Sequence, residues 1–192
     1  AALHEIGPAL EAGEEHRIHL VSQSATDLNL SFVVEEGQAA RLIQEKLESQ
    51  RMQQEMAVAK QIQETILPQD VGKIPGATIG VAYYPAREVG GDFYDVVKVS
   101  DQEFLVIIGD VSNKGVPAAL VMSASWGIIK SQLAHEPGIS VSQLACRLND
   151  LLSHEIIKDK EMFVTLFFAR FNVAERRLTF CNAGHLPGMF WD

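Results

Sequence analysis

The sequence has few cysteines and little to suggest that those it has are cross-linked. Its 192 residues include only Cys146 and Cys181, with no CxxC pair and no Cys/His cluster. This excludes a disulfide-stapled scaffold and a structural zinc site, and it is typical of free, partly buried thiols in a reducing compartment. We therefore expect a cytoplasmic protein.

Positive charge and long apolar runs are also scarce. The 16 Lys and Arg residues stand against 25 Asp and Glu, a formal net charge of −9, so no broad basic surface is expected to attract nucleic acid. No apolar stretch approaches the roughly 20 residues that span a bilayer, and the start has no signal-peptide pattern. An initiating Met is absent as well. We expect a fragment of a longer protein, which could carry an upstream sensor or membrane-tethering domain.

Hydrophobic residues make up 47% of the chain, enough for one sizeable core plus an extension. The extension comes first, and two apolar stripes with steps of three and four predict helices packing along other helices. The first stripe comprises Ile18, Val21, Ala25, Leu28 and Phe32, and the second comprises Met52, Met56, Ala59, Ile62 and Ile66. We predict that residues 1–67 form a helical, coiled-coil-like linker or the end of a sensor region. A hinge, stutter or break is expected between Gly37 and Ser49, and Leu67-Pro68 should end the helix.

Residues 68–192 have the pattern of a mixed α+β domain. Strands are expected at 78–84, 93–99, 104–108, 162–171 and 177–181, with a further strand starting at 188. Pro117 suits the first turn of a helix over 118–133, and Ser140 could cap a second helix. The buried stripe of that second helix would be Val141, Leu144, Leu148, Leu151 and Leu152. Runs of strands predict antiparallel sheets carrying helices on one face.

Asp92 and Asp110 each follow a glycine and lie eighteen residues apart, with two predicted strands and a polar turn between them. A hairpin of this kind brings both carboxylates to the same end. Paired carboxylates suit a hard divalent cation, although each aspartate alone is more typical of a turn. Asp95, three residues after Asp92, should point to the opposite face and play a supporting role.

Several ordered motifs resemble one family of enzymes. They are GGDFYD at 90–95, IGDVSNKG at 108–115, PAAL at 117–120 and NAGHLP at 182–187, with further matches at 61–68, 83–92, 148–152 and 162–166. Together, over residues 55–191, they resemble the bacterial metal-dependent PP2C-type (PPM) phosphatases of the SpoIIE/RsbU-like branch. The resemblance implies a layered αββα fold with two Mn²⁺ or Mg²⁺ ions at the edge of a β-sandwich.

The resemblance also implies roles for individual residues. Asp92 and Asp110 would be the catalytic metal ligands, joined by the backbone carbonyl of Val111. The expected supporting residues are Gly91, Asp95, Gly109 and Asn113. The family usually has glycine where this chain has Asn113, a position that could need the left-handed backbone that asparagine tolerates best among other residues. His185 is expected to be a structural hydrogen-bonding residue, and no role is assigned to Lys114 or Asn182.

Two bound cations would lower the pKa of a water so that it attacks phosphorus in line, without a covalent enzyme intermediate. By resemblance, the substrate is phosphoserine or phosphothreonine on a regulatory protein, typically the STAS-domain anti-anti-sigma factor of a bacterial partner-switching pathway. The N-terminal helix would transmit a sensor signal and form a homodimer. A diguanylate cyclase of the GGDEF type is a weaker match, because GDVSNKGVPAAL has no counterpart there.

Family members carry two further acidic motifs after AGHxP, and this sequence stops at Asp192 before either. We therefore expect these 192 residues alone to bind the ions weakly and to have little phosphatase activity, whereas the intact protein would be active. The alternative function is that of a degenerate phosphatase or a fragment that acts as a dimeric signal-transmitting module.

Overall fold

The computed structural model describes residues 17–19, 31–33, 36–68, 70–71, 77–84, 88–158 and 161–189, with side chains described from residue 41 onward. The chain divides into two compact units, Ala1–Gln54 and Glu55–Asp192. None of the helices in these described ranges combines the length and apolar character needed to cross a membrane.

Two short strands lie in the first unit, β1 (Arg17–His19) and β2 (Ser31–Val33). They pair antiparallel, with Ile18 opposite Phe32. The predicted helical seam is therefore wrong at these two positions. A β-branched and an aromatic residue also suit facing positions in a sheet, and steps of three and four could not exclude that pairing. The other seam residues, Val21, Ala25 and Leu28, lie outside the described residues.

Helix α1 (Glu36–Ile66) is one unbroken helix of 31 residues. The expected hinge or break between Gly37 and Ser49 is not present. The helix contains no proline, and its only glycine lies in the first turn, where it interrupts little. The helix ends just before Leu67-Pro68, as the sequence predicts.

The buried face of α1 differs from the predicted stripe. Met56, Ala59 and Ile66 are partly buried as expected, but Met52 and Ile62 are 63% and 60% exposed. Gln63 is buried instead, with 6% of its surface exposed. Because a helix turns by about 100° per residue, position 63 lies within roughly 20° of Met56, whereas Ile62 lies about 120° away.

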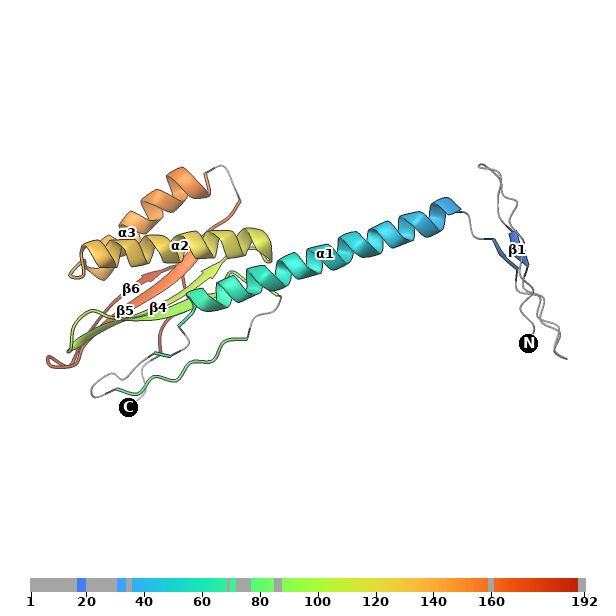
Figure 1. Ribbon diagram of the computed structural model, residues 1–192. Coiled ribbons are helices and arrows are strands. Elements are labelled where there is room, and N and C mark those ends of the chain that lie inside the picture. Colours follow the sequence, from blue (N-terminus) through green and yellow to red (C-terminus); the bar gives the residue numbers. More distant parts are fainter. Residues whose placement is uncertain are drawn as a thin grey trace. The chain divides into compact units, whose positions relative to one another are not determined.

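Four antiparallel strands form the sheet of the second unit, in the order β3-β4-β5-β6 (Figure 1). They are β3 (Phe93–Lys98), β4 (Glu103–Val111), β5 (Val164–Asn172) and β6 (Arg177–Ala183). The predicted hairpin and the last two strands are confirmed, with small shifts of their ends. The predicted strand over 78–84 is not: those residues form no strand, and Val81 and Tyr84 are exposed. Strand-forming residues alone do not make a strand, because a strand also needs a neighbouring strand with which to pair. Residues 188 and 189 are not in a strand either, and 190–192 lie outside the described residues.

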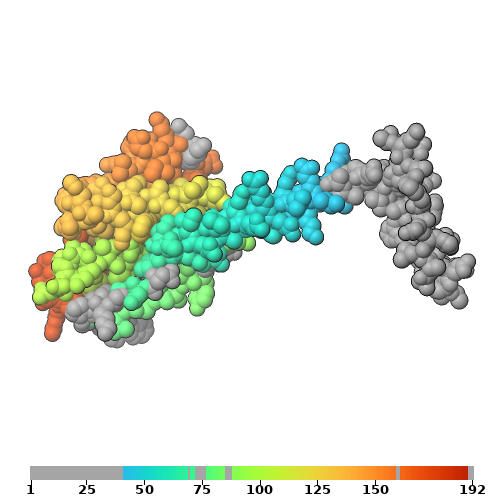
Figure 2. Space-filling model, viewed as in Figure 1, coloured from blue at the N-terminus to red at the C-terminus, as the bar shows by residue number. Residues whose placement is uncertain are grey.

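Helices α2 (Val116–His135) and α3 (Val141–Leu151) cover one face of this sheet (Figure 1), and their surfaces form adjacent yellow and orange ridges (Figure 2). Pro117 lies in the first turn of α2, and Ser140 caps α3 through a capping box with Gln143, as predicted. The chain then widens into a π-helical turn, η1 (Leu152–Ile156); Leu151 is exposed and Leu152 is buried. The stripe prediction is thus wrong at Leu151 only.

The two faces of the sheet have different surroundings. Phe93, Leu105, Ile107 and Phe168 are buried beneath the helices. Side chains of the opposite face, such as Ile108 and Phe180, are exposed. Of the expected αββα layers, the described residues of the second unit contain one antiparallel sheet and the helices on one of its faces. The two candidate metal-binding aspartates belong to the face opposite the helices.

Candidate active site

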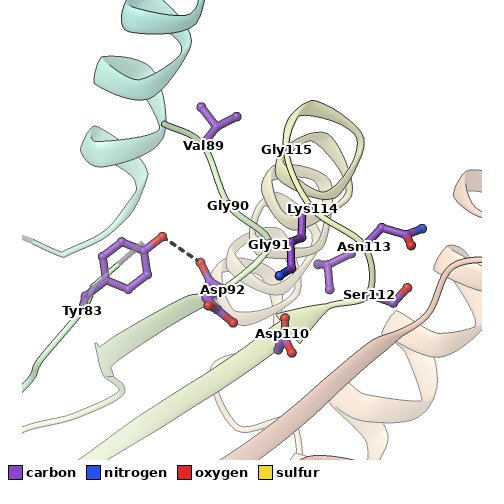
Figure 3. A pocket seen from close by; sticks show the side chains of 11 residues that line it. Tyr83, Val89, Gly90, Gly91, Asp92, Asp110, Ser112, Asn113, Lys114 and Gly115 are labelled. Atoms are coloured by element: carbon purple, nitrogen blue, oxygen red, sulfur yellow. Dashed lines mark hydrogen bonds between the residues drawn. The ribbon is translucent and has the colours of Figure 1, made fainter. Parts of the chain in front are cut away.

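The β3–β4 hairpin brings Asp92 and Asp110 together. Phe93 pairs with Gly109, so continuing the register by one step places Asp92 directly opposite Asp110. The prediction that both carboxylates lie at the same end of the hairpin is confirmed. Both project toward one cavity (Figure 3).

The proximity of Asp110 changes the titration of Asp92. Partial burial raises the pKa of Asp92 above its ordinary value of 3.8, and a side-chain hydrogen bond and charge repulsion from Asp110 raise it further. His185 acts in the opposite direction and lowers that pKa. Two carboxylates held this close cannot both be charged without cost, and a cation between them would relieve that cost.

Glycines allow backbone segments to approach each other closely, and the arrangement of the two aspartates depends on this close approach. A Cβ on Gly91 would lie 2.7 Å from the Val111 carbonyl oxygen and 3.2 Å from the Ala118 Cβ. A Cβ on Gly109 would overlap the Phe93 ring and lie 2.8 Å from Leu166 Cδ2. The turn before Asp92 therefore rests directly on the end of β4, with the Val111 carbonyl at the contact.

The loop between β4 and α2 forms the other wall. Asn113 has a φ of 73°, which confirms that this position uses the left-handed backbone, and Gly115 follows with a φ of 75°. Ser112 exchanges two hydrogen bonds with Phe163: its N–H donates to the Phe163 carbonyl at 2.9 Å, and its Oγ accepts from the Phe163 N–H at 2.8 Å. The loop is therefore held in a defined conformation.

The cavity between these walls has a volume of about 400 Å³. Its oxygen donors include the Asp92 and Asp110 carboxylates, and Val111 contributes to its lining. Carboxylate and carbonyl oxygens are the ligands that hard divalent cations prefer, so the donor set fits Mg²⁺ or Mn²⁺. Among the described residues, no group of three or more His, Cys, Asp or Glu side chains could hold a metal ion.

Two residues that the sequence interpretation did not single out contact the turn before β3. The buried Gln63 side chain donates to the Gly90 carbonyl at 2.7 Å and accepts from the Gly90 N–H at 2.9 Å. The Tyr83 hydroxyl donates to the Asp92 backbone carbonyl at 3.3 Å (Figure 3). Burial raises the pKa of Tyr83, as does the nearby charge of Asp92. The feature that could have indicated Gln63 is its position as a polar residue on the buried face of a helix.

Asp95 lies on the opposite face from Asp92, as predicted, and does not line the cavity. Its buried carboxylate accepts hydrogen bonds from Lys130 Nζ at 2.9 Å, Trp126 Nε1 at 3.1 Å and the Val96 N–H at 2.8 Å. Asp95 thus ties β3 to α2.

His185 is hydrogen-bonded, as expected. One ring nitrogen lies 2.9 Å from Thr165 Oγ1, and the backbone N–H and carbonyl of His185 both bond to the Asn182 side chain. Thr165 pairs with Asp110 across β4 and β5, so these contacts fix the segment after β6 beside the aspartate pair.

Comparison with known proteins adds independent information. The family model described as Stage II sporulation protein E (SpoIIE) matches residues 100–192. The phosphoserine phosphatase RsbU of Bacillus subtilis (strain 168) is 32% identical over 191 residues, which cover 99% of this chain and 53% of RsbU. Protein IcfG of Synechocystis is 27% identical, over 96% of this chain and 34% of that protein.

The fold has a similar counterpart among solved structures. The SiaA-PP2C domain of Pseudomonas aeruginosa matches with a TM-score of 0.60 and 19% identity, over 70% of this chain and 55% of that one. The present chain spans about half the length of RsbU and a third of IcfG. Sequence motifs, family match and fold agree: the chain is similar to the SpoIIE/RsbU-like branch of the PP2C-type phosphatases.

Proposed function

We propose that the protein is a metal-dependent serine/threonine phosphatase that acts on a phosphorylated regulatory protein in a bacterial, cytoplasmic partner-switching pathway. The observation that carries this proposal is the pair of carboxylates, Asp92 and Asp110, facing one cavity at the end of a rigid hairpin. RsbU, the relative at 32% identity, is named a phosphoserine phosphatase.

In this proposal Asp92, Asp110 and the Val111 carbonyl hold two Mn²⁺ or Mg²⁺ ions. When bound, such ions make water nucleophilic near neutral pH and offset the charge of the phosphate. The reaction forms a new P–O bond to the water oxygen and breaks the P–O bond to the serine or threonine oxygen. The electron pair goes to that leaving oxygen, which gains a proton. No serine or cysteine nucleophile is needed.

The supporting residues keep the ligands in position. Gly91 lets the turn before Asp92 lie against Val111, and Gly109 makes room for the Phe93 ring beneath the hairpin. Asn113 provides the left-handed turn that closes the cavity wall. Asp95 holds β3 against α2 from the other face.

We further propose that residues 1–67 transmit a signal to a hydrolytic domain in 68–192, and that the substrate is a STAS-domain anti-anti-sigma factor. Support for transmission comes from Gln63, because α1 reaches the metal-binding turn through its two hydrogen bonds with Gly90. Movement of the helix end would shift the backbone two residues before Asp92.

The test is phosphatase activity of the intact protein on a phosphoserine STAS-domain protein with Mn²⁺. Asp92→Asn and Asp110→Asn should each reduce kcat/KM by about a hundredfold or more, because each removes a charged ligand. Asp101→Asn, a change of an exposed turn carboxylate, should have no effect. Unchanged turnover in both site variants would refute the metal-hydrolase proposal.

A second candidate is a signal-transmitting module without catalysis. The observation that favours it is the small donor set of the described residues, which contains no cluster of three potential metal ligands. The same experiment separates the two candidates, since a module of this kind would show no Mn²⁺-dependent hydrolysis before any substitution.

A further inference from the structure

Lys114 lies in the loop between β4 and α2. The loop backbone is anchored on both sides of this lysine. Asn113 and Gly115 flank it with φ angles of 73° and 75°. The loop is anchored before Lys114 by the reciprocal Ser112–Phe163 hydrogen bonds. After it, the Gly115 carbonyl accepts the first helical hydrogen bond of α2, from the Ala119 N–H at 3.0 Å. The backbone that carries the lysine is therefore fixed before any ligand binds.

The Lys114 side chain lines the cavity with Asp92 and Asp110, and its amino group points into that cavity (Figure 3). Among the described residues that line the cavity, it is the one cationic side chain. It forms no ion pair or hydrogen bond with any other described residue, whereas Lys98 is paired with Asp101 and Lys130 with Asp95. Its charge is thus available to a ligand.

The charges in the cavity indicate what that ligand is. Divalent cations bound by Asp92 and Asp110 would neutralise the two carboxylates, which leaves the ammonium of Lys114 uncompensated. A phosphate monoester brings about two negative charges and three acceptor oxygens. An ammonium group is a compact charge with three donors and suits such an oxygen cluster.

We propose that Lys114 binds the phosphoryl group of the substrate, and the inorganic phosphate product, in the cavity beside the aspartate pair. This inference rests on the proposed phosphatase function and deepens it. It makes Lys114 the residue that selects phosphate monoester dianions over neutral or singly charged groups.

The test uses the intact protein loaded with Mn²⁺ and inorganic phosphate as the probe, with binding measured by calorimetry. Lys114→Met should weaken phosphate binding about tenfold or more, the usual loss for one charge-assisted hydrogen bond. Lys114→Arg should restore most of it. Lys98→Met, which removes an exposed lysine far along β3 from the cavity, should leave phosphate binding unchanged.

Two further measurements separate binding from a structural role. With a phosphoserine peptide, Lys114→Met should raise KM and the inhibition constant of phosphate more than it lowers kcat. Its Mn²⁺ affinity without phosphate should be equal to or tighter than that of the original chain, because a cation near the carboxylates has been removed. A loss of Mn²⁺ affinity would overturn the proposal by showing that Lys114 only holds the loop.

The outcomes also distinguish this proposal from the proposed function. A chain that hydrolyses phosphopeptides, but whose Lys114→Met variant keeps its phosphate affinity and KM, overturns the role of Lys114 and leaves the phosphatase function standing. A chain that hydrolyses nothing, yet loses phosphate binding on the same substitution, supports the role of Lys114 and refutes the function.

Discussion

The Asp92 carboxylate makes the metal-free protein less stable as the pH rises. Burial and the neighbouring Asp110 raise its pKa in the folded chain above 3.8, the value expected when unfolded. Between these two pKa values the folded state binds more protons than the unfolded state. The free energy of unfolding therefore falls as the pH rises through this window.

We expect Asp92→Asn to be more stable than the original chain at neutral pH without metal, and to lose that advantage below about pH 4. Thermal unfolding at a series of pH values, with a chelator present, measures this difference. Adding Mn²⁺ should raise the Tm of the original chain more than that of the variant.

Asp101→Asn is the matched control for this titration. A hydrogen bond and the charge of Lys98 lower the pKa of Asp101, so replacing it gives no stability gain that grows with pH. An Asp92→Asn variant less stable than the original chain at neutral pH would contradict the assigned cause.

At the scale of elements, the end of α1 and the turn before β3 are joined by one side chain. Gln63 bonds to both backbone groups of Gly90 and is 6% exposed. Its removal would leave the partly buried N–H and carbonyl of Gly90 without these partners, which costs about 1–3 kcal/mol.

We expect Gln63→Leu to lower the free energy of unfolding by about 1–3 kcal/mol and to weaken Mn²⁺ binding, because the turn that carries Asp92 loses its support. Chemical denaturation and Mn²⁺ titration measure the two effects. Gln61→Leu, on the exposed side of the same helix turn, should change stability by less than about 0.5 kcal/mol. Normal Mn²⁺ affinity in folded Gln63→Leu would show that α1 does not act through this amide.

At the scale of the whole molecule, the exposed apolar side chains of α1 raise the question of self-association. Ile43, Leu47, Val58 and Ile62 are all exposed on this helix. Apolar residues recurring along an otherwise charged helix are typical of helix pairing. We propose that two copies of the chain pair through α1.

Sedimentation measurements over a range of concentrations should show a monomer–dimer equilibrium. Leu47→Glu should shift it toward the monomer, because it places a charge in the apolar seam. Ser49→Glu is the control, since it adds the same charge about 200° around the helix. A monomer at all concentrations would refute pairing through α1.

The local sequence was sufficient to predict the parts of the site that depend on adjacent residues. The spacing of Asp92 and Asp110 around a polar turn predicted the hairpin, whereas the left-handed backbone of Asn113 was expected from the resemblance to the phosphatases. Pro117 and Ser140 marked the starts of α2 and α3. Turns, caps and alternation act over a few residues, so the sequence by itself determines them.

Only the tertiary structure decided which partner each surface meets. Apolar periodicity pointed to Ile62, but the amide of Gln63 is the group that bonds to the backbone N–H and carbonyl of Gly90. Residues 78–84 have strand-forming composition but form no strand in the described structure. The ion pair of Asp95 with Lys130, and the free ammonium of Lys114 facing the two aspartates, likewise depend on contacts between distant segments. Such contacts follow from packing rather than from local propensity, which is why the sequence alone could not supply them.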